Sequence, residues 1–399
     1  MADPLKLRIL MVHNGYKIRG GEDISAEMET QVLREAGHHV DYVTAENDDI
    51  QTTRDMARTA ASAIWSRAWH RKVSNMLAVG GYDILHAQNL FPLISPSIYY
   101  AARRHGVPVV QAVRNYRLAC PSATILREGK VCTDCIGRRI KLPSVRHRCY
   151  RGSAVGTAAV GAISGWHGAV GTWRDKVDCY LAVSNTVADV LAQEGFPPDR
   201  IMVKPDFTYR VGTAHLRPPK RSHVLFVGRL SPEKGLPLLF DAWSRVHSDL
   251  PLRVVGEGRM PANVPKGVEL VGKKPLEGVL EEMRDAVCVV MPGSWPEPFG
   301  RVAVEAFSQG TPVIASDSGG VADTVQSGRN GALFKTGDAY DLATQLSHLL
   351  QDTDARHRCE AGAMASYTDR FTPEANLTYL EQAYDRAKTV AGAPLSRVS

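Results

Sequence analysis

Residues 224–235 of this chain read VLFVGRLSPEKG, and the fold prediction rests on the pattern in this stretch. Its four leading apolar residues predict a buried strand, and Gly228 begins a loop that contains one Arg and one Lys. A helix is predicted to follow the loop. A buried strand joined by a short loop to a helix is the repeating unit of a parallel α/β sheet.

The same alternation of short apolar runs with amphipathic helical stretches occurs twice along the chain. In the first half, strands are expected at residues 8–13, 39–44, 83–86, 108–113 and 178–183, with a helix from about Glu22 to Ala36 after the first of them. In the second half, strands are expected at 224–227, 252–255, 268–271, 287–291 and 312–315. This pattern predicts two doubly wound parallel sheets, each forming a Rossmann-like domain.

The polar, proline-containing stretch 206–222 interrupts the alternation and is interpreted as a connector between domains. We therefore expect an N-terminal domain over residues 1–205 and a second domain over 206–372. The C-terminal helix within 373–399 is expected to pack back on the first domain. Because parallel sheets bind ligands at the carboxyl ends of their strands, the two domains are expected to face across a cleft that holds the active site.

The composition, 44% hydrophobic and 23% charged over 399 residues, is typical of a globular protein with more than one domain. No apolar run approaches the roughly 20 residues that span a bilayer. The N-terminus also lacks the basic start and long apolar segment of a signal peptide. These features predict a cytoplasmic protein.

Positive charge is concentrated in the first half, where 26 Lys and Arg face 19 Asp and Glu, and above all in residues 114–151. This segment is expected to meet something anionic. The aromatic platforms of nucleic-acid-binding modules are absent, so we expect no nucleic acid and favour a lipid diphosphate or an anionic membrane surface.

Residues 52–76 are predicted to form a basic helix that would associate peripherally with such a membrane. It carries Arg54, Arg58, Arg67, Arg71 and Lys72, with Trp65 and Trp69 one turn apart. The alternative is that the two Trp side chains pack on the domain core.

Four of the seven cysteines, Cys120, Cys132, Cys135 and Cys149, lie in the basic segment at spacings compatible with a structural zinc site. Reduced thiols without metal are the alternative.

The loop from Gly228 to Gly235 offers backbone N–H groups at the start of a helix, together with Arg229 and Lys234. Such a loop suits a diphosphate. A capped helix start with solvated Arg and Lys is the simpler alternative.

A second motif lies at the next strand-to-helix junction, where Glu297 and Glu305 are eight positions apart. Carboxylates accept hydrogen bonds from vicinal diols, which both ribose and hexose present. Glu297 is flanked by Trp295, Pro296, Pro298 and Phe299, which is unusual for a solvated loop. The two carboxylates are therefore predicted to contact different parts of one elongated ligand.

These motifs resemble those of retaining, family 4 type glycosyltransferases of the GT-B fold, also called glycosyl transferases group 1. The resemblance covers the Gly228–Lys234 loop, the turn with Glu257, the Glu297 to Glu305 motif and the stretch 310–320. In the first half it covers Gly20-Gly21-Glu22 and residues 37–40. It implies a hexosyltransferase that moves a sugar from a nucleoside-diphosphate sugar to a polysaccharide, lipid-linked or small-molecule acceptor, without a metal for catalysis.

The resemblance also implies residue roles. Arg229, Lys234 and Glu297 would be catalytic, the two cations neutralising the diphosphate and Glu297 holding the transferred sugar. Glu305 would bind the ribose, backbone N–H groups of Phe299 and Gly300 would touch the sugar, and Glu257 would lie near the donor. Gly20, Gly21 and Gly228 would let the backbone approach the phosphates.

On the acceptor side, His86 and Asn89 end a predicted strand and are candidate contacts. Arg114 stands where many relatives have a His that contacts the donor sugar. This departure leaves open a catalytically silent sugar-nucleotide binder, and a hydrolase or epimerase on the same fold is a further alternative.

Overall fold

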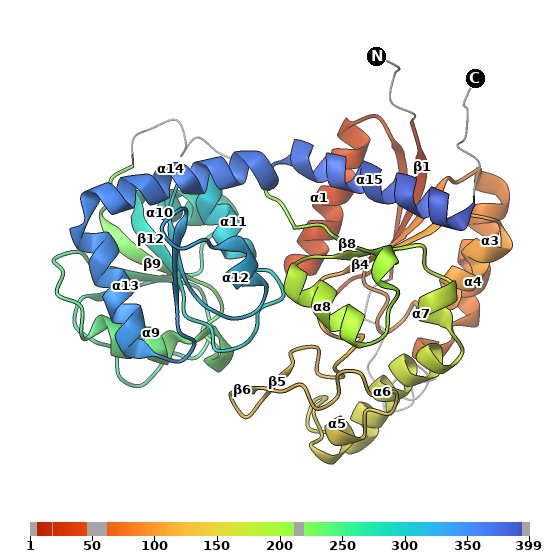
Figure 1. Cartoon of the computed structure of the whole chain (residues 1–399), viewed down its shortest axis with the longest axis horizontal. Helices are drawn as coiled ribbons and strands as arrows, with labels where there is room; N and C mark the ends of the chain where they lie inside the picture. Colours follow the sequence, from red (N-terminus) through yellow and green to blue (C-terminus); the bar gives the residue numbers. More distant parts are fainter. Residues whose placement is uncertain (1–5, 18, 46–61, 211–218, 393–399) are drawn as a thin grey trace. The chain divides into compact units, whose positions relative to one another are not determined.

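The computed structural model describes residues 6–17, 19–45, 62–210 and 219–392 of the chain. They divide into two compact units. Unit 1 contains the residues up to Ile125, Cys132–Lys204 and the chain from Asn376 onward, and unit 2 contains Leu126–Val131 and Pro205–Ala375. Each unit holds one six-stranded parallel sheet flanked by helices (Figure 1). The two α/β sheets predicted from the alternation are confirmed.

The sheet of unit 1 has the strand order β2-β1-β3-β4-β7-β8. Its strands are β1 (Arg8–Asn14), β2 (His39–Ala45), β3 (Ile84–Ala87), β4 (Val109–Val113), β7 (Cys179–Ala182) and β8 (Ile201–Val203). The helices are α1 (Gly21–Glu35), α3 (Arg67–Gly80), α4 (Ser97–Arg104), α5 (Leu142–Arg146), α6 (Ala154–Ala169), α7 (Thr172–Asp175), α8 (Asn185–Gln193) and the 3-10 turn η2 (Pro198–Arg200). The strand order reverses between β1 and β3.

The sheet of unit 2 has the order β11-β10-β9-β12-β13-β14 and reverses between β9 and β12. Its strands are β9 (His223–Val227), β10 (Leu252–Val255), β11 (Val268–Gly272), β12 (Ala286–Met291), β13 (Val313–Ser316) and β14 (Gly331–Phe334). The helices are η4 (Pro232–Lys234), α9 (Leu236–Trp243), α10 (Leu276–Asp285), α11 (Arg301–Ser308), α12 (Gly320–Thr324), α13 (Ala339–Gln351) and α14 (Thr353–Arg370). A short antiparallel hairpin, β5 (Leu126–Arg127) and β6 (Lys130–Val131), is grouped with this unit.

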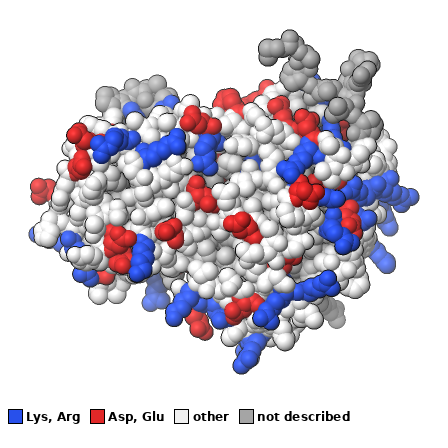
Figure 2. All heavy atoms as spheres, in the orientation of Figure 1, with Lys and Arg blue, Asp and Glu red and all other residues white. Residues whose placement is uncertain are grey.

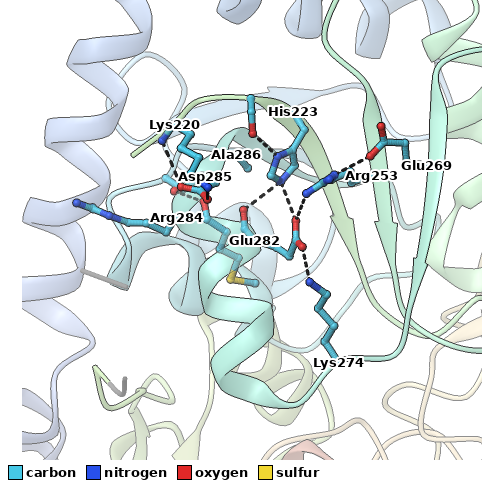
Figure 3. Close-up of polar contacts among 12 residues, drawn as sticks. Lys220, His223, Arg253, Glu269, Lys274, Glu282, Arg284, Asp285 and Ala286 are labelled. Atoms are coloured by element: carbon cyan, nitrogen blue, oxygen red, sulfur yellow. Dashed lines mark hydrogen bonds and ion pairs between the residues drawn. The ribbon is translucent and has the colours of Figure 1, made fainter. Parts of the chain in front are cut away.

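The core of unit 2 forms because the apolar strands β9, β10 and β12 are buried between helices. Side chains such as Phe226, Leu239 and Val290 are almost fully buried and belong to one hydrophobic cluster. At the amino ends of these strands, a charged network joins α10 to the sheet (Figure 3). The carboxylate of Glu282 lies 3.0 Å from the Arg253 guanidinium and 3.3 Å from His223 Nε2, and it also accepts a hydrogen bond from Lys274. The network therefore stabilises the edge opposite to the ligand-binding loops.

The last helix, α15 (Pro373–Ala391), returns to unit 1. Tyr384 is fully buried there, and its hydroxyl lies 2.9 Å from His86 Nδ1 on β3. Arg386 donates a hydrogen bond to the carbonyl of Asp199. The fold of unit 1 thus includes residues from both ends of the described chain.

Candidate functional site

The loops that follow β9 and β12 flank the reversal of strand order in unit 2, where open α/β sheets bind their ligands. Lys234 ends the first loop and Glu297 lies in the second. Lys234 Nζ is 2.7 Å from Glu297 Oε1, and both side chains are about one-fifth exposed. The fold therefore brings Lys234, which was predicted to bind the diphosphate, into direct contact with Glu297, which was predicted to bind the sugar.

Close backbone packing fixes this pair. Gly235 has φ +75°, and a Cβ there would lie 2.0 Å from the carbonyl oxygen of Pro292. Gly319 has φ +68°, and a Cβ there would lie 2.6 Å from the carbonyl oxygen of Glu297. The amide of Gly320 donates to that same carbonyl at 2.7 Å. Only glycine at positions 235 and 319 allows the loops after β9, β12 and β13 to approach so closely.

Arg229 lies on the same loop as Lys234, and Glu257 lies on the loop after β10; both are in more exposed positions. The Arg229 side chain is 74% exposed, and its nearest carboxylate oxygen, on Glu233, is 3.5 Å away. Glu257 forms an exposed ion pair with Lys273. Exposed pairs of this kind contribute little to stability, so both side chains can turn to a ligand at low energetic cost. The backbone beneath them is rigid, because the amides of Gly228 and Leu230 donate to Val255 and Glu257.

Glu305 lies four residues into α11, whose N-terminus is capped by Gly300 with φ +98°. Burial raises the pKa of Glu305, an effect only partly offset by Arg301 at 3.4 Å on the same helix. Phe299 is buried, and its ring packs against Phe371. This packing joins the start of α11 to the C-terminal end of α14.

Unit 1 contains a pocket at the ends of β1, β3 and β4, where its own strand order reverses. Its polar lining includes His13, Glu22, Asn89, Arg114 and Arg117, and its apolar lining includes Phe91, Leu118, Val160, Ile163 and Trp173. Two acceptor-side candidates, Asn89 and Arg114, thus line one pocket.

Arg114 is held by a buried charge network. Its guanidinium lies 2.6 Å from Glu29 Oε1 and donates to the amide oxygen of Gln88. Glu29 also pairs with Lys204 and accepts from the Gln88 amide nitrogen at 2.7 Å. Burial would raise the pKa of Glu29, but Arg114 and Lys204 outweigh it and hold the pKa well below its ordinary value. Sequence reasoning missed Glu29, Gln88 and Lys204, because they come from three separate elements.

His86 does not line the pocket. It is fully buried, its Nδ1 faces Tyr384, and its Nε2 lies 3.2 Å from Gln88 Nε2. Burial lowers the pKa of His86 to about 4, so the ring is neutral. The structure gives this residue a structural role in place of the predicted acceptor contact.

Asp23 holds the loop of unit 1 that contains Gly20 and Gly21 in place. Sequence reasoning also missed this residue. Gly20 caps α1, and its amide donates to Asp23 Oδ2 at 2.7 Å. Asp23 Oδ1 lies 2.9 Å from His13 Nε2. Gly21 begins the helix, so both predicted glycines lie at the N-terminus of α1.

Comparison with known proteins places both units in one family. The model of the glycosyl transferase 4-like domain matches residues 20–206, and that of glycosyl transferases group 1 matches residues 213–365. The chain belongs to the group 1 glycosyltransferases.

Similar sequences agree with this family. An uncharacterized glycosyltransferase of Methanocaldococcus jannaschii is 33% identical over 33% of this chain and 39% of its own length. A D-inositol 3-phosphate glycosyltransferase of Corynebacterium kroppenstedtii is 31% identical over 41% of this chain and 40% of its own length. These alignments therefore span about two fifths of each relative. An uncharacterized protein from the cps region of Klebsiella pneumoniae is 22% identical over 77% of this chain and 84% of its own length.

Solved structures show that the fold is GT-B. Anabaena HepE in complex with UDP and glucose superimposes with a TM-score of 0.63 at 17% identity, covering 95% of this chain and 99% of that one. Sucrose-phosphate synthase of Thermosynechococcus elongatus gives a TM-score of 0.65 at 18% identity, covering 96% and 99%.

The four cysteines of the predicted zinc site all lie in the part of the chain that the structure describes. Among the residues that the structure describes, no three His, Cys, Asp or Glu side chains are grouped as metal ligands. Cys135 is buried, whereas Cys120, Cys132 and Cys149 are partly exposed. None of the four forms a disulfide, and the zinc site stays a prediction.

The predicted basic helix is described only in its second part, since Arg54 and Arg58 lie outside the described residues. Trp65 precedes α3 and packs against Tyr100 with ring centroids 5.1 Å apart. Lys72 lies over the ring of Trp69. No helix in the described ranges combines the length and apolar character needed to cross a bilayer.

Proposed function

We propose that this glycosyltransferase moves a sugar from a nucleoside-diphosphate sugar to an acceptor hydroxyl, with retention of configuration. The contact between Lys234 and Glu297 is the observation that carries this proposal. At the reversal of strand order, the lysine suits the anionic diphosphate of the donor, and the carboxylate suits the hydroxyl groups of its sugar. The two side chains form an ion pair in the structure.

Charge stabilisation on the leaving group provides the catalysis in this proposal. When the bond between the sugar and the diphosphate breaks, negative charge grows on the diphosphate, and Lys234 and Arg229 stabilise it. Glu297 orients the sugar and Glu305 holds the ribose. The acceptor hydroxyl bonds to the anomeric carbon on the face that the diphosphate leaves, and the departing phosphate takes its proton.

The acceptor belongs in the unit 1 pocket. Leu118, Val160 and Ile163 form an apolar wall, and Arg117 lies at the same pocket. Of polysaccharide, lipid-linked and small-molecule acceptors, this wall favours those that carry an apolar group. UDP-hexoses are the first donors to test, because the similar HepE structure contains UDP and glucose.

Release of nucleoside diphosphate from a panel of sugar nucleotides tests the proposal. Lys234→Ala should lower turnover about 100- to 1,000-fold, the usual cost of removing one fixed charge from a developing anion. Lys266→Ala, an exposed lysine of the same unit, is the matched control and should leave turnover unchanged. Normal turnover in folded Lys234→Ala would contradict the assignment.

A silent sugar-nucleotide binder remains the second candidate, because Arg114 replaces the expected His and is engaged by Glu29. Such a protein would be stabilised by UDP in a thermal-shift experiment yet release no product with any donor and acceptor. Free sugar released without an acceptor would instead indicate a hydrolase.

A further inference from the structure

Helix α6 is exceptional because its 16 residues, AVGTAAVGAISGWHGA, contain no Asp, Glu, Lys or Arg. Its exposed residues are Val155, Ala158, Ala162, Trp166, Gly168 and Ala169. All but Gly168 are spaced by three or four positions and lie on one stripe along the helix. Val155 is 81% and Trp166 57% exposed. The outward face of α6 is therefore an apolar surface in contact with solvent.

This exposure does not result from poor packing of the helix. On the opposite face, Val160, Ile163 and Ser164 line the pocket, and His167 Nε2 lies 2.8 Å from the carbonyl oxygen of Ile64. The side chain of Ser153 caps the N-terminus by accepting from the amide of Gly156. A well-anchored helix that still exposes a Trp and a Val is typical of a surface that meets a partner.

The segment before α6 extends the same apolar surface. Ile140 is 78% and Leu142 66% exposed. Between them, Lys141 is buried and its ammonium group lies 2.8 Å from the Glu194 carboxylate. A Cβ at Gly165 would lie 2.7 Å from the carbonyl oxygen of Arg139, so the segment packs directly on α6. Ile140 and Leu142 are thus held beside the helix.

Positive charge predominates around this surface. No Asp or Glu occurs between Asp134 and Asp175. The exposed cations are Arg138, Arg139, Arg146, Arg148 and Arg151, and none of them forms an ion pair with a carboxylate of the described residues. Figure 2 shows both Lys or Arg and Asp or Glu side chains along the lower edge of this view, part of which Figure 1 draws as α5 and α6.

We propose that the stripe of α6 and the segment 138–151, together called the α6 surface, dock on an anionic lipid bilayer. Apolar side chains with a Trp enter the interface between headgroups and acyl chains, while surrounding arginines pair with lipid phosphates. With 16 residues the helix lies on the bilayer and does not cross it. This proposal does not depend on the proposed function, because docking needs no donor.

A second copy of the chain fits this surface less well. A two-fold interface sets a patch against itself, so five arginines of one copy would face five of the other without a carboxylate between them. An anionic bilayer instead supplies the missing negative charge. Charge complementarity therefore selects the membrane.

Co-sedimentation of the full chain with phosphatidylcholine vesicles, with and without 30 mol% phosphatidylserine, tests the proposal. The wild type should bind the anionic vesicles at low salt and be released as salt screens the arginines. The triple variant Arg138→Gln, Arg139→Gln, Arg146→Gln should lower the partition coefficient about 100-fold, since each cation contributes roughly a factor of five. Val155→Ser with Trp166→Ser should also weaken binding, at least about tenfold, because both side chains leave the interface.

Two matched controls locate the contact. Arg67→Gln, Arg71→Gln, Lys72→Gln removes the same charge from α3 and should keep binding within about twofold. Tyr340→Ser with Leu270→Ser removes exposed apolar side chains of unit 2 and should also have no effect. Thermal unfolding of each variant checks the fold.

Three outcomes would overturn the proposal. The first is the absence of binding by the wild type at low salt, and the second is loss of binding in the α3 variant with retention in the α6 variants. The third is a concentration-dependent dimer in analytical ultracentrifugation that the α6 variants abolish without any effect of vesicles. That last result would assign the surface to a second copy.

Discussion

At the residue scale, Glu29 is the central residue of the buried charge network beside the pocket of unit 1. Its carboxylate is fully buried and is shared by Arg114 and Lys204. A buried carboxylate between two cations cannot be removed without leaving both cations uncompensated. The residue at position 114 therefore depends on the residue at position 29: Arg114 is explained by its ion pair with Glu29.

Replacement of Glu29 by Gln should lower the free energy of unfolding by about 3–5 kcal/mol, because uncompensated cations stay buried. Urea denaturation followed by circular dichroism measures this change. Glu27→Gln, on the same helix but exposed and paired with Arg19, should change it by less than about 0.5 kcal/mol. Equal decreases in the two variants would show that the buried network contributes no more to the free energy of unfolding than an exposed ion pair does.

At the scale of elements, the network between α10 and its sheet makes the stability of unit 2 depend on pH. Burial lowers the pKa of His223 below its ordinary value of 6.5. Burial opposes the charged form of Glu282, but Lys274 and Arg253 outweigh it and hold the pKa of Glu282 below 4.5. In both cases the unfolded chain binds the proton more readily than the folded one.

Acidification from pH 7 to pH 4 should therefore destabilise unit 2. The contribution of His223 is complete above its unfolded pKa and is lost as the pH falls below 6.5, and that of Glu282 is lost below 4.5. His223→Gln should make the decrease between about pH 6.5 and pH 5 shallower in urea titrations. His348→Gln, at an exposed histidine, should leave the slope unchanged. An unchanged slope in His223→Gln would refute the role of this network.

At the scale of the whole molecule, residues far apart in sequence complete one domain. Tyr384 of α15 and His86 of β3 meet 298 positions apart. Gln88 then connects His86 to Glu29. The C-terminal helix is thus part of the support beneath the pocket.

Tyr384→Ala should destabilise unit 1 by about 3–5 kcal/mol, the usual cost of deleting a buried aromatic ring. Tyr384→Phe keeps the ring and loses one hydrogen bond, so it should cost only about 1 kcal/mol. Hydrogen exchange of the β1 and β3 amides gives a readout local to this unit. If both variants behaved alike, the ring would contribute nothing beyond its hydroxyl.

The ten strands expected from sequence are present within one residue of their expected starts. Two strands of the parallel sheets, β8 and β14, were missed, and both are edge strands; the hairpin strands β5 and β6 were also not expected. Edge strands have only one neighbour and need no long apolar run, so their pattern is weak. The Glu297 loop was recognisable from its apolar neighbours, whereas the Glu29 network left no local pattern.

The two parallel sheets, the loops at their strand ends and the family could be predicted from the amino-acid sequence, because strand periodicity and loop motifs are properties of short contiguous segments. Three features became visible only in the folded chain: the contact of Lys234 with Glu297, the link of Glu29 to Arg114 and Lys204, and the exposed apolar face of α6. These features depend on which distant segments lie side by side. Burial and charge pairing are set by those neighbours and not by the residue types alone.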